Sequence, residues 1–259
     1  MKILAIQNRM GIGDMVIFLP YIEAIAKKFS TRVSLLVKDS SKAEQYLKKT
    51  DYIKEIISLK RDKNKKGLHD GIGGFFKLAN ELKTQKFDKV IIFNSSLRYN
   101  LICRVAGIKE IFQYPLFEKA GQHLTDTPKK FFLEKFDLQV NNNPKIYIDE
   151  NHENVTLAKY NLNEKKVNIL LGIGGSGPTK RVPSSIFIEI IKLCKEKYDC
   201  QFLLATGNKE EEQVILKEIL NFYKNDCIRL DKLSIYETLP LIKNCSISIC
   251  NDSSFSHLS

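Results

Sequence analysis

Short apolar segments alternate with helical segments along most of this chain, and that alternation restricts the fold more than any other feature of the sequence. The apolar segments are too short for core helices and lie between polar turns, which is typical of buried strands. The expected strands are residues 2–7, 32–38, 53–59, 88–94, 110–114, 167–173, 201–206, 227–230 and 246–250. Strands that are separated by helices pair into parallel sheets with helices on both faces. We therefore predict an α/β protein.

The intervening segments carry apolar residues at helical spacing. The expected helices are residues 14–29, 41–49, 71–84, 97–106, 151–160, 184–198, 209–222 and 234–244. Residues 139–166 interrupt the alternation with polar runs around Pro144, and besides the helix at 151–160 we expect only a short strand at 145–148 there. We place a domain boundary in this stretch and predict two doubly wound, Rossmann-like domains, residues 1–145 and 146–259.

The composition is that of an ordinary globular protein. Hydrophobic residues make up 43% of the chain and charged residues 27%, and no segment approaches the roughly 20 apolar residues of a membrane span. The first apolar run, residues 1–7, is too short for a signal peptide, so we expect a cytoplasmic protein. No Cys-x-x-Cys pair occurs among the six cysteines, which favours reduced, buried thiols over disulfides or zinc ligands.

The chain is strongly basic, with a formal net charge of +11. Excess positive charge raises the affinity for anionic partners of any kind. We find no motif in which aromatic residues are interleaved with basic ones, so no nucleic-acid partner is expected. An anionic membrane surface ranks first among the partners, although a solvated lysine-rich surface accounts for the charge equally well.

A glycine-rich turn follows the first expected strand and opens the first helix, the place where open α/β sheets bind ligands. Gly11 and Gly13 fit a dinucleotide-binding pattern, but Val16 occupies its third glycine position, so NAD binding remains a weak alternative. Asp14 then has two interpretations, a carboxylate that caps the helix or a general base in a cleft. Spacing alone favours the first.

A second glycine-rich loop follows the first expected strand of the C-terminal half. Gly174 and Gly175 allow a ligand to approach the backbone closely, Ser176 offers a hydroxyl, and Lys180 and Arg181 offer charge. A Walker motif is absent. The density of small and cationic groups favours an anion-binding loop over an ordinary flexible connection.

Two further loops of the C-terminal half carry polar groups. Gly207 precedes a helix start with three glutamates, residues 210–212, which suit either the helix dipole or a bound nucleoside. Residues 246–250 form a strand that runs into the turn 251–254 and the start of a helix, where free backbone N–H groups suit a phosphate. His257 is either a structural residue or a ligand contact, and we expect the chain to lack its natural C-terminus because it stops in this element.

Five short motifs, taken in their order along essentially the whole chain, resemble those of glycosyltransferase family 9, the ADP-heptose:lipopolysaccharide heptosyltransferases and their relatives. The motifs are Gly13-Asp14 followed by Pro20, the strand Phe87-Asp88-Lys-Val-Ile-Ile92, the run Lys180-Arg-Val-Pro183, Gly207 before a glutamate-rich helix start, and Asn251-Asp252-Ser253-Ser254-Phe-Ser-His257-Leu258. Each motif is weak by itself, but their order and spacing are specific.

The resemblance implies a GT-B fold, two Rossmann-like domains facing a cleft, and an inverting glycosyltransferase that uses neither a metal nor a cofactor. It implies that Asp14 is the base that deprotonates the acceptor hydroxyl, which reverses the preference from spacing alone. Gly11 and Gly13 would form the acceptor-side loop. The implied donor is a nucleotide sugar, ADP-heptose in this family, with Glu211 at its nucleoside. The other implied donor-binding residues are Gly174, Gly175, Ser176, Lys180, Asp252, Ser253, Ser254 and His257.

The implied acceptor is a lipopolysaccharide core or a similar lipid-anchored glycan, which suits a cytoplasmic protein held peripherally at the inner face of the inner membrane. The sequence departs from the family at Ser254, where the family has glycine, and at Val182, where it has tryptophan. Because the family's last strand and helices are absent after Ser259, we also expect the second domain to be incomplete.

Two alternatives of the same fold stay open beside the weak dehydrogenase reading. A nucleotide-sugar epimerase would turn over the sugar nucleotide without an acceptor. A degenerate sugar-nucleotide-binding protein would bind the donor without transfer, and Ser254 motivates this reading.

Overall fold

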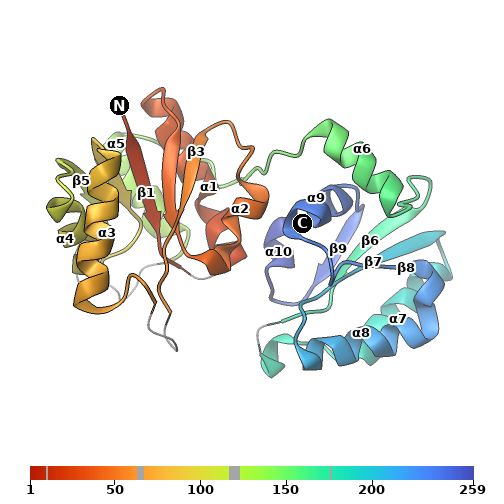
Figure 1. Ribbon diagram of the computed structural model, residues 1–259. Helices are drawn as coiled ribbons and strands as arrows, with labels where there is room; N and C mark the ends of the chain where they lie inside the picture. Colours follow the sequence, from red (N-terminus) through yellow and green to blue (C-terminus); the bar gives the residue numbers. More distant parts are fainter. Residues whose placement is uncertain (10, 63–66, 117–122, 176) are drawn as a thin grey trace. The chain divides into compact units, whose positions relative to one another are not determined.

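The computed structural model describes residues 1–9, 11–62, 67–116, 123–175 and 177–259. The chain divides into two compact units, Met1–Tyr147 and Ile148–Ser259, which we call the N-terminal and C-terminal units. Each unit is built around one parallel sheet with helices packed on it (Figure 1). The predicted α/β class with two parallel sheets is confirmed.

The N-terminal unit contains a five-stranded parallel sheet in the order β3-β2-β1-β4-β5. Its strands are β1 (Ile3–Gln7), β2 (Val33–Val37), β3 (Ile53–Ser58), β4 (Lys89–Ile92) and β5 (Glu110–Gln113). Its helices are α1 (Ile12–Lys28), α2 (Ala43–Tyr46), α3 (Gly71–Gln85), α4 (Leu97–Val105) and α5 (Asp126–Phe136), with a 3-10 turn at Asp39–Ser41. The chain winds outward from β1 to β3 and then returns to place β4 on the other side of β1.

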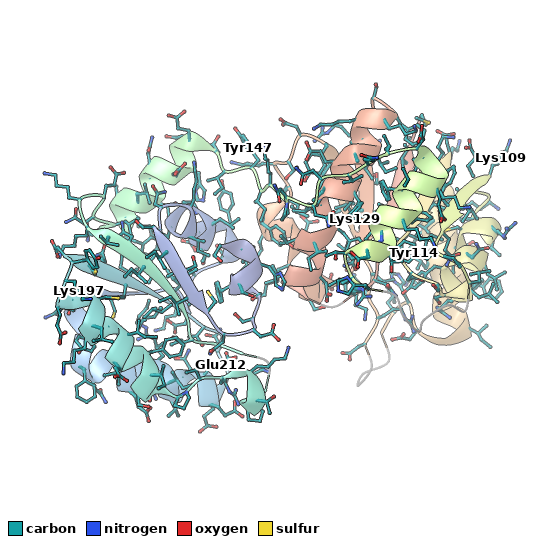
Figure 2. All side chains as sticks on the ribbon, turned by 180° about the vertical axis from the view of Figure 1, so that it is seen from behind. Lys109, Tyr114, Lys129, Tyr147, Lys197 and Glu212 are labelled. Atoms are coloured by element: carbon teal, nitrogen blue, oxygen red, sulfur yellow. The ribbon has the colours of Figure 1, made fainter. Side chains whose placement is uncertain are left out.

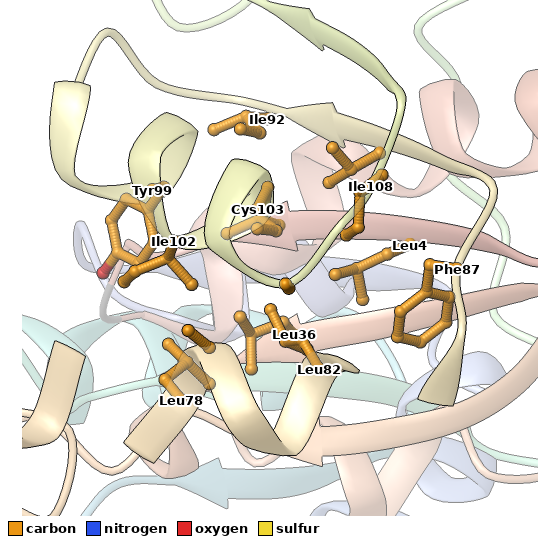
Figure 3. Packing of buried hydrophobic residues seen from close by; sticks show 14 of the residues in the cluster. Leu4, Leu36, Leu78, Leu82, Phe87, Ile92, Tyr99, Ile102, Cys103 and Ile108 are labelled. Carbon is orange, nitrogen blue, oxygen red and sulfur yellow. The ribbon is translucent and has the colours of Figure 1, made fainter. Parts of the chain in front are cut away.

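Helices α3 and α4 cover one face of this sheet and bury an apolar cluster against it (Figure 3). Leu78 and Leu82 come from α3, Ile102 and Cys103 from α4, and Leu4 from the central strand. All five side chains are almost completely inaccessible to solvent. Apolar residues that recur at helical spacing on α3 and α4 thus meet the continuous apolar runs of the buried strands.

Aromatic rings tie α1 and α5 together. Tyr21 of α1 packs edge-on against Phe132 of α5 with 5.0 Å between ring centroids. Phe93, which follows β4, contacts both Phe18 (4.9 Å) and Phe132 (6.0 Å). The Tyr21 hydroxyl donates to Asn142 Oδ1 at 2.5 Å, so the polar stretch after α5 is held against α1.

The C-terminal unit contains a four-stranded parallel sheet in the order β8-β7-β6-β9. Its strands are β6 (Val167–Gly172), β7 (Cys200–Ala205), β8 (Cys227–Arg229) and β9 (Ile247–Cys250). Its helices are α6 (Glu150–Lys159), α7 (Ser184–Lys195), α8 (Glu210–Tyr223), α9 (Ile235–Lys243) and α10 (Phe255–Leu258), with 3-10 turns at Pro178–Lys180 and Lys224–Asp226. Phe187 of α7 and Leu216 of α8 belong to the cluster on one face, whereas Leu157 of α6, Leu241 of α9 and Phe255 of α10 belong to the cluster on the other.

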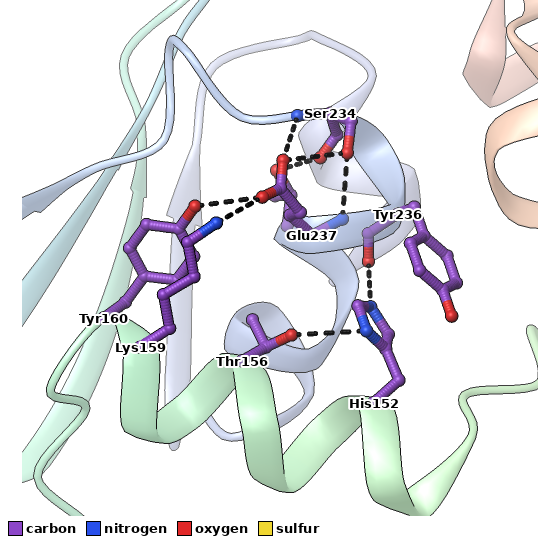
Figure 4. A network of polar contacts seen from close by, with 8 residues as sticks. His152, Thr156, Lys159, Tyr160, Ser234, Tyr236 and Glu237 are labelled. Atoms are coloured by element: carbon purple, nitrogen blue, oxygen red, sulfur yellow. Dashed lines mark hydrogen bonds and ion pairs between the residues drawn. The ribbon is translucent and has the colours of Figure 1, made fainter.

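A polar network joins α6 to the first turn of α9 (Figure 4). Ser234 and Glu237 form a capping box, in which the Glu237 amide donates to Ser234 Oγ and the Ser234 amide donates to Glu237 Oε2, both at 3.2 Å. Lys159 Nζ and the Tyr160 hydroxyl donate to the other oxygen of Glu237 at 2.9 and 3.1 Å. One carboxylate therefore caps α9 and also holds α6.

The structure departs from the sequence-based expectations in three places. The strand expected at 145–148 was wrong: these residues are irregular, because no neighbouring strand is there to bond them. The helix expected at 41–49 is shorter, since only Ala43–Tyr46 is α-helical. Helix α5 was missed, although Pro128 in its first turn and its phenylalanines at helical spacing are signals of a helix.

Candidate active site

In open α/β sheets, ligands bind outside the carboxyl ends of the strands where the winding direction reverses. In the N-terminal unit this switch point lies between β1 and β4, and in the C-terminal unit it lies between β6 and β9. Gly11, Gly13 and Asp14 follow β1, Gly174 and Gly175 follow β6, and residues 251–254 follow β9. The sequence-predicted residues therefore lie beside the switch point of their own unit.

Asp14 occupies the third position of α1 and caps the start of that helix. Its Oδ2 accepts a hydrogen bond from the Gly11 amide at 3.0 Å. Gln7 fixes the same turn, because its Nε2 donates to the Asp14 carbonyl oxygen at 3.1 Å and its Oε1 accepts from the Arg9 amide at 2.5 Å. Asp14 is half-buried, and its Oδ1 has no protein partner in the part of the chain that the structure describes. The carboxylate therefore caps the helix with one oxygen, and its other oxygen is open to a further hydrogen bond.

The loop after β4 adds polar atoms to the same edge of the sheet, which the sequence analysis missed. The Phe93 amide donates to Ile6 O at 3.1 Å, so Asn94 comes just beyond the end of β1. Gln113 clamps this loop, since its Nε2 donates to the carbonyl oxygens of Asn94 and Ser96 at 2.9 and 3.0 Å.

Two polar atoms beside this clamp are buried without a partner among the described residues, Asn94 Nδ2 and the Tyr114 hydroxyl. Burial, the largest cause, raises the pKa of Tyr114 far above its usual value, so the phenol is neutral and can donate a hydrogen bond. Buried polar atoms that lack a protein partner call for a ligand or water. The polar run 94–96 directly after a buried strand is the sequence signal that points to this loop.

In the C-terminal unit, Glu212 of α8 binds two glycine loops at once. Its Oε1 accepts from the Gly175 amide at 3.0 Å and its Oε2 accepts from the Gly207 amide at 2.9 Å. Glu212, labelled in Figure 2, is only 6% exposed. The expectation that the Gly174 and Gly175 amides are free for a phosphate is therefore not met in this structure, because Gly175 bonds to Glu212 and Gly174 donates to Ala205 O at 3.3 Å.

Asn251 joins the loop after β9 to the loop after β6. Its Nδ2 donates to Ile173 O at 3.0 Å and its Oδ1 accepts from the Val182 amide at 3.3 Å. The side chain is nearly inaccessible to solvent. Together Glu212 and Asn251 hold three loops in place at one edge of the sheet. Both residues lie in segments that the sequence analysis singled out, Glu212 among the glutamates 210–212 and Asn251 in the turn 251–254, but their role in holding the loops was not predicted.

Lys180 and Asp252 meet on this edge as an exposed ion pair. The hydrogen bond from Lys180, followed by its charge, holds the pKa of Asp252 below its usual value, and the charge of His257 acts in the same direction. The amides of Ser253 and Ser254 have no acceptor among the described residues, whereas Ser253 Oγ accepts from the Phe255 amide at 3.3 Å. The edge thus offers an exchangeable cation and two free amide donors.

The remaining predicted residues are less favourably placed. Glu211 is exposed, and one of its oxygens lies 3.6 Å from a guanidinium nitrogen of Arg181. Ser176 lies outside the described residues. Thr206 is a further candidate, because its hydroxyl is buried close to Gly174 and has no partner among the described residues.

Cysteines and possible metal ligands are the other side chains to consider among the residues that the structure describes. All six cysteines are free, and burial raises the pKa of Cys103, Cys227 and Cys245 to about 12. Within the described ranges, no group of three or more histidine, cysteine, aspartate or glutamate side chains could hold a metal ion. In the same ranges, no helix has the length and apolar character needed to cross a bilayer.

Comparisons with known proteins agree with this architecture. The family model for glycosyltransferase family 9 (heptosyltransferase) matches residues 75–259, which is more than half of the chain. No curated protein sequence matches. The Escherichia coli ADP-heptose lipopolysaccharide heptosyltransferase II structure is 18% identical, with 100% of this chain and 81% of that chain covered and a TM-score of 0.75.

Two further solved structures are also similar. A family 9 glycosyltransferase from Veillonella parvula is 19% identical over 99% of this chain and 77% of its own, with a TM-score of 0.79. The E. coli heptosyltransferase WaaC with ADP is 14% identical over 100% of this chain and 83% of its own, with a TM-score of 0.69. The predicted resemblance and the GT-B-type fold are thus confirmed. The chain belongs to glycosyltransferase family 9, the heptosyltransferase family.

Proposed function

We propose that the protein is an inverting, metal-independent glycosyltransferase that moves heptose from ADP-heptose onto a lipopolysaccharide core or a similar lipid-anchored glycan. Membership of the family indicates a nucleotide-sugar donor. One observation carries the proposal: three loops of the C-terminal unit are braced by Glu212 and Asn251, and they present Lys180 with the free amides of Ser253 and Ser254. ADP bound to the similar WaaC supports adenine as the donor base.

In this proposal the cation of Lys180 serves the leaving nucleoside diphosphate. The diphosphate gains negative charge as its bond to the sugar breaks. Groups that interact more strongly with this developing charge in the transition state than with the bound donor lower the barrier. Lys180 is half exposed and its described partner is Asp252, which a phosphate oxygen can replace. The amides of Ser253 and Ser254 add donors that need no rearrangement.

Asp14 acts as the base. The acceptor oxygen attacks the anomeric carbon on the side opposite the diphosphate, Oδ1 of Asp14 takes the hydroxyl proton, and the bond from the anomeric carbon to the diphosphate oxygen breaks with inversion. The bond between Oδ2 and the Gly11 amide fixes the orientation of the carboxylate during this step. The unpartnered Asn94 Nδ2 and Tyr114 hydroxyl would bind acceptor hydroxyls.

Ser254 does not by itself argue for a degenerate site. Its backbone has φ −58° and ψ −28°, a right-handed helical conformation that any residue adopts. The serine that stands where the family has glycine therefore introduces no backbone strain. What still favours the binding-protein alternative is the side chain that the serine adds near the proposed phosphate position.

The test is transfer from ADP-heptose to a heptose-deficient lipopolysaccharide core, with and without EDTA. We expect Asp14→Asn to lower kcat by about 10²- to 10⁴-fold, the usual contribution of a general base, while donor affinity stays unchanged. We expect Lys180→Ala to weaken donor binding by about tenfold, because a charge-assisted bond is lost. The control is Glu44→Gln, which alters an exposed carboxylate on α2 of the same unit as Asp14.

Each alternative predicts its own result. Chemical change of the sugar nucleotide without any acceptor would identify an epimerase. Donor binding without transfer to any glycan, equally tight in wild type and in Asp14→Asn, would identify a binding protein. Loss of transfer in EDTA would contradict the metal-independent chemistry, and transfer from another nucleotide sugar alone would replace ADP-heptose as the donor.

A further inference from the structure

Helices α3 and α4 expose two rows of large apolar side chains. Ile72 and Phe76 of α3 are 80% and 53% exposed, and Leu68 just before the helix continues their four-residue spacing. Leu97, Leu101 and Val105 repeat the same spacing on α4 and are also exposed. Side chains four residues apart lie on the same side of a helix, so each helix carries one apolar row that faces solvent. Contiguous exposed apolar groups of this kind mark interaction sites.

The two helices lie next to each other, and Arg98 ties their starts together. Its Nη2 donates to the carbonyl oxygens of His69 and Gly71, both at 2.9 Å, and its guanidinium lies 5.6 Å from the centroid of the Phe75 ring. Figure 1 shows α3 and α4 side by side on one side of the sheet. We call the six exposed side chains of this helix pair the apolar face: Leu68, Ile72, Phe76, Leu97, Leu101 and Val105.

The two helices carry more basic than acidic residues. Helices α3 and α4 carry four basic residues, Lys77, Lys83, Arg98 and Arg104, against one acidic residue, Glu81, which gives +3 from 4 − 1. That single carboxylate is engaged, because one of its oxygens bonds to His69 Nε2 at 3.0 Å.

The pair α7 and α8 of the C-terminal unit is different. It also exposes large apolar residues, Ile186 and Leu193 on α7 and Val214 and Phe222 on α8, but it carries three lysines and five glutamates, which gives −2 from 3 − 5. Of these two helix pairs, α3 and α4 alone combine apolar rows with positive charge. That combination complements an anionic lipid surface, where apolar side chains enter the interface and basic ones attract headgroups.

We propose that the apolar face of α3 and α4 docks the protein on an anionic lipid bilayer. This inference rests on the proposed function, because membrane docking serves an enzyme whose acceptor is anchored in lipid. Helices α3 and α4 begin at the carboxyl edge of the sheet, where Asp14 also lies, because they follow strands β3 and β4. Docking through the first turns of α3 and α4 brings that edge close to the bilayer, where a lipid-anchored acceptor presents its sugar.

The test is co-sedimentation with vesicles of phosphatidylethanolamine and phosphatidylglycerol, beside vesicles of phosphatidylcholine alone. We expect the wild type to bind the anionic vesicles, more weakly as salt rises. The double variant Ile72→Glu/Leu101→Glu should bind at least tenfold more weakly. The matched control is Leu133→Glu on α5 of the same unit, which is 48% exposed against 43% for Leu101 and should bind like the wild type. Circular dichroism melts verify that all variants are folded.

Three results would overturn the proposal: equal binding by the double variant, equal binding to phosphatidylcholine vesicles, or a dimer that the double variant dissociates without any change in vesicle binding. The last would assign the face to a second copy of the chain. Transfer to a lipid-free core oligosaccharide separates this proposal from the proposed function. Docking fails alone if the wild type transfers to the soluble acceptor and binds no vesicles. The proposed function fails alone if nothing is transferred while vesicle binding still depends on the face.

Discussion

The two units each place a carboxylate behind the glycine loop that follows their first strand, but the two carboxylates hold these loops differently. Asp14 bonds to Gly11, three residues away on its own turn, and uses one oxygen. Glu212 bonds to Gly175, 37 residues away, and to Gly207, and it uses both oxygens while nearly buried. Asp14, which caps its own helix, thus has one carboxylate oxygen without a described partner. Both oxygens of Glu212 are occupied by the hydrogen bonds to the two loops.

The switch-point asparagines show the same contrast. Asn251 uses both ends of its amide to hold the loop after β6. Asn94 accepts one bond from the Ser96 amide at 2.9 Å, and its Nδ2 has no described partner. In the C-terminal unit both polar side chains, Glu212 and Asn251, are thus used up in holding loops, and the groups left without a described partner are the Thr206 hydroxyl and the backbone amides of Ser253 and Ser254. The edge of the N-terminal unit keeps two buried atoms without a described partner, Asn94 Nδ2 and the Tyr114 hydroxyl, which suits the acceptor binding that we propose there.

The largest expected effect on stability comes from removing the brace. Glu212→Ala leaves the buried amide of Gly175 and the part-buried amide of Gly207 without their acceptor, and we expect a loss of about 3 kcal/mol in the free energy of unfolding. Denaturant unfolding followed by circular dichroism measures the loss, and hydrogen exchange at the two glycines should speed up. Glu211→Ala, which changes the exposed neighbour, should cost less than about 0.5 kcal/mol. Equal costs for both substitutions would contradict the contrast drawn between the two edges.

The close packing of the braced loop gives the next largest effect. A Cβ at residue 175 would lie 2.6 Å from the Lys180 carbonyl oxygen, a backbone atom that cannot move away freely. We expect Gly175→Ala to destabilise the protein by about 2 kcal/mol, the usual cost of overpacking. Gly177→Ala is the matched control in the same loop, since nothing lies within 4 Å of a Cβ there. A neutral Gly175→Ala, measured in the same denaturant series, would show that the loop is not held as tightly as its hydrogen bonds indicate.

Features that depend on neighbouring residues were predictable from the sequence. The alternation of strands and helices predicted all nine strands that the structure describes. The polar turns predicted the helix after Gly207 and the first helix, which begins at Ile12, two residues before the expected start. These signals lie within one or two turns of chain. They are sufficient because a buried parallel strand needs only a short apolar run, and a helix start needs only a suitable cap.

Features that depend on distant contacts were not predictable. The sequence alone does not distinguish Glu210, Glu211 and Glu212. Only the packing of α8 against the sheet determines that the side chain of Glu212 is the buried one. The strand expected at 145–148 has suitable apolar residues but no neighbour to pair with. The amides of Gly174 and Gly175 were expected to be free because their acceptors, Ala205 O and Glu212, come from elements far along the chain.

Glu237 combines both kinds of interaction: it caps its own helix together with Ser234, and it bonds to Lys159, which is far away in the sequence. The hydrogen bond from Lys159, followed by that from the Ser234 amide, lowers its pKa from 4.5 to about 2. A folded-state pKa below the unfolded value means that the added stability is complete above about pH 4.5 and is lost as the pH falls toward 2. We expect about 1 kcal/mol, because Lys159 is largely exposed and solvent screens the pair.

Unfolding measured at pH 6, 4 and 3 for the wild type and Glu237→Gln tests this contribution. The stability difference between the two proteins should shrink as the pH falls. The control is Glu164→Gln, which changes an exposed carboxylate of the same unit. A difference that grows at low pH would mean that Glu237 is protonated more easily in the folded protein than in the unfolded one, opposite to the direction given by its hydrogen bonds.

The smallest effect on stability is expected at Asp14. If Asp14 is a local cap and Glu212 holds two loops, substitution of Asp14 must cost much less stability than substitution of Glu212. Asp14→Asn keeps an oxygen that can accept from the Gly11 amide and removes only the attraction of a charge to the helix start, so we expect a loss of about 0.5 kcal/mol. Glu212→Gln, the same chemical change at the brace, should cost several times more, because one buried amide N–H then faces an NH₂ group. If Asp14→Asn costs as much as Glu212→Gln in the same denaturant series, the carboxylate is a structural brace, and a loss of transfer in that variant would no longer identify it as the base.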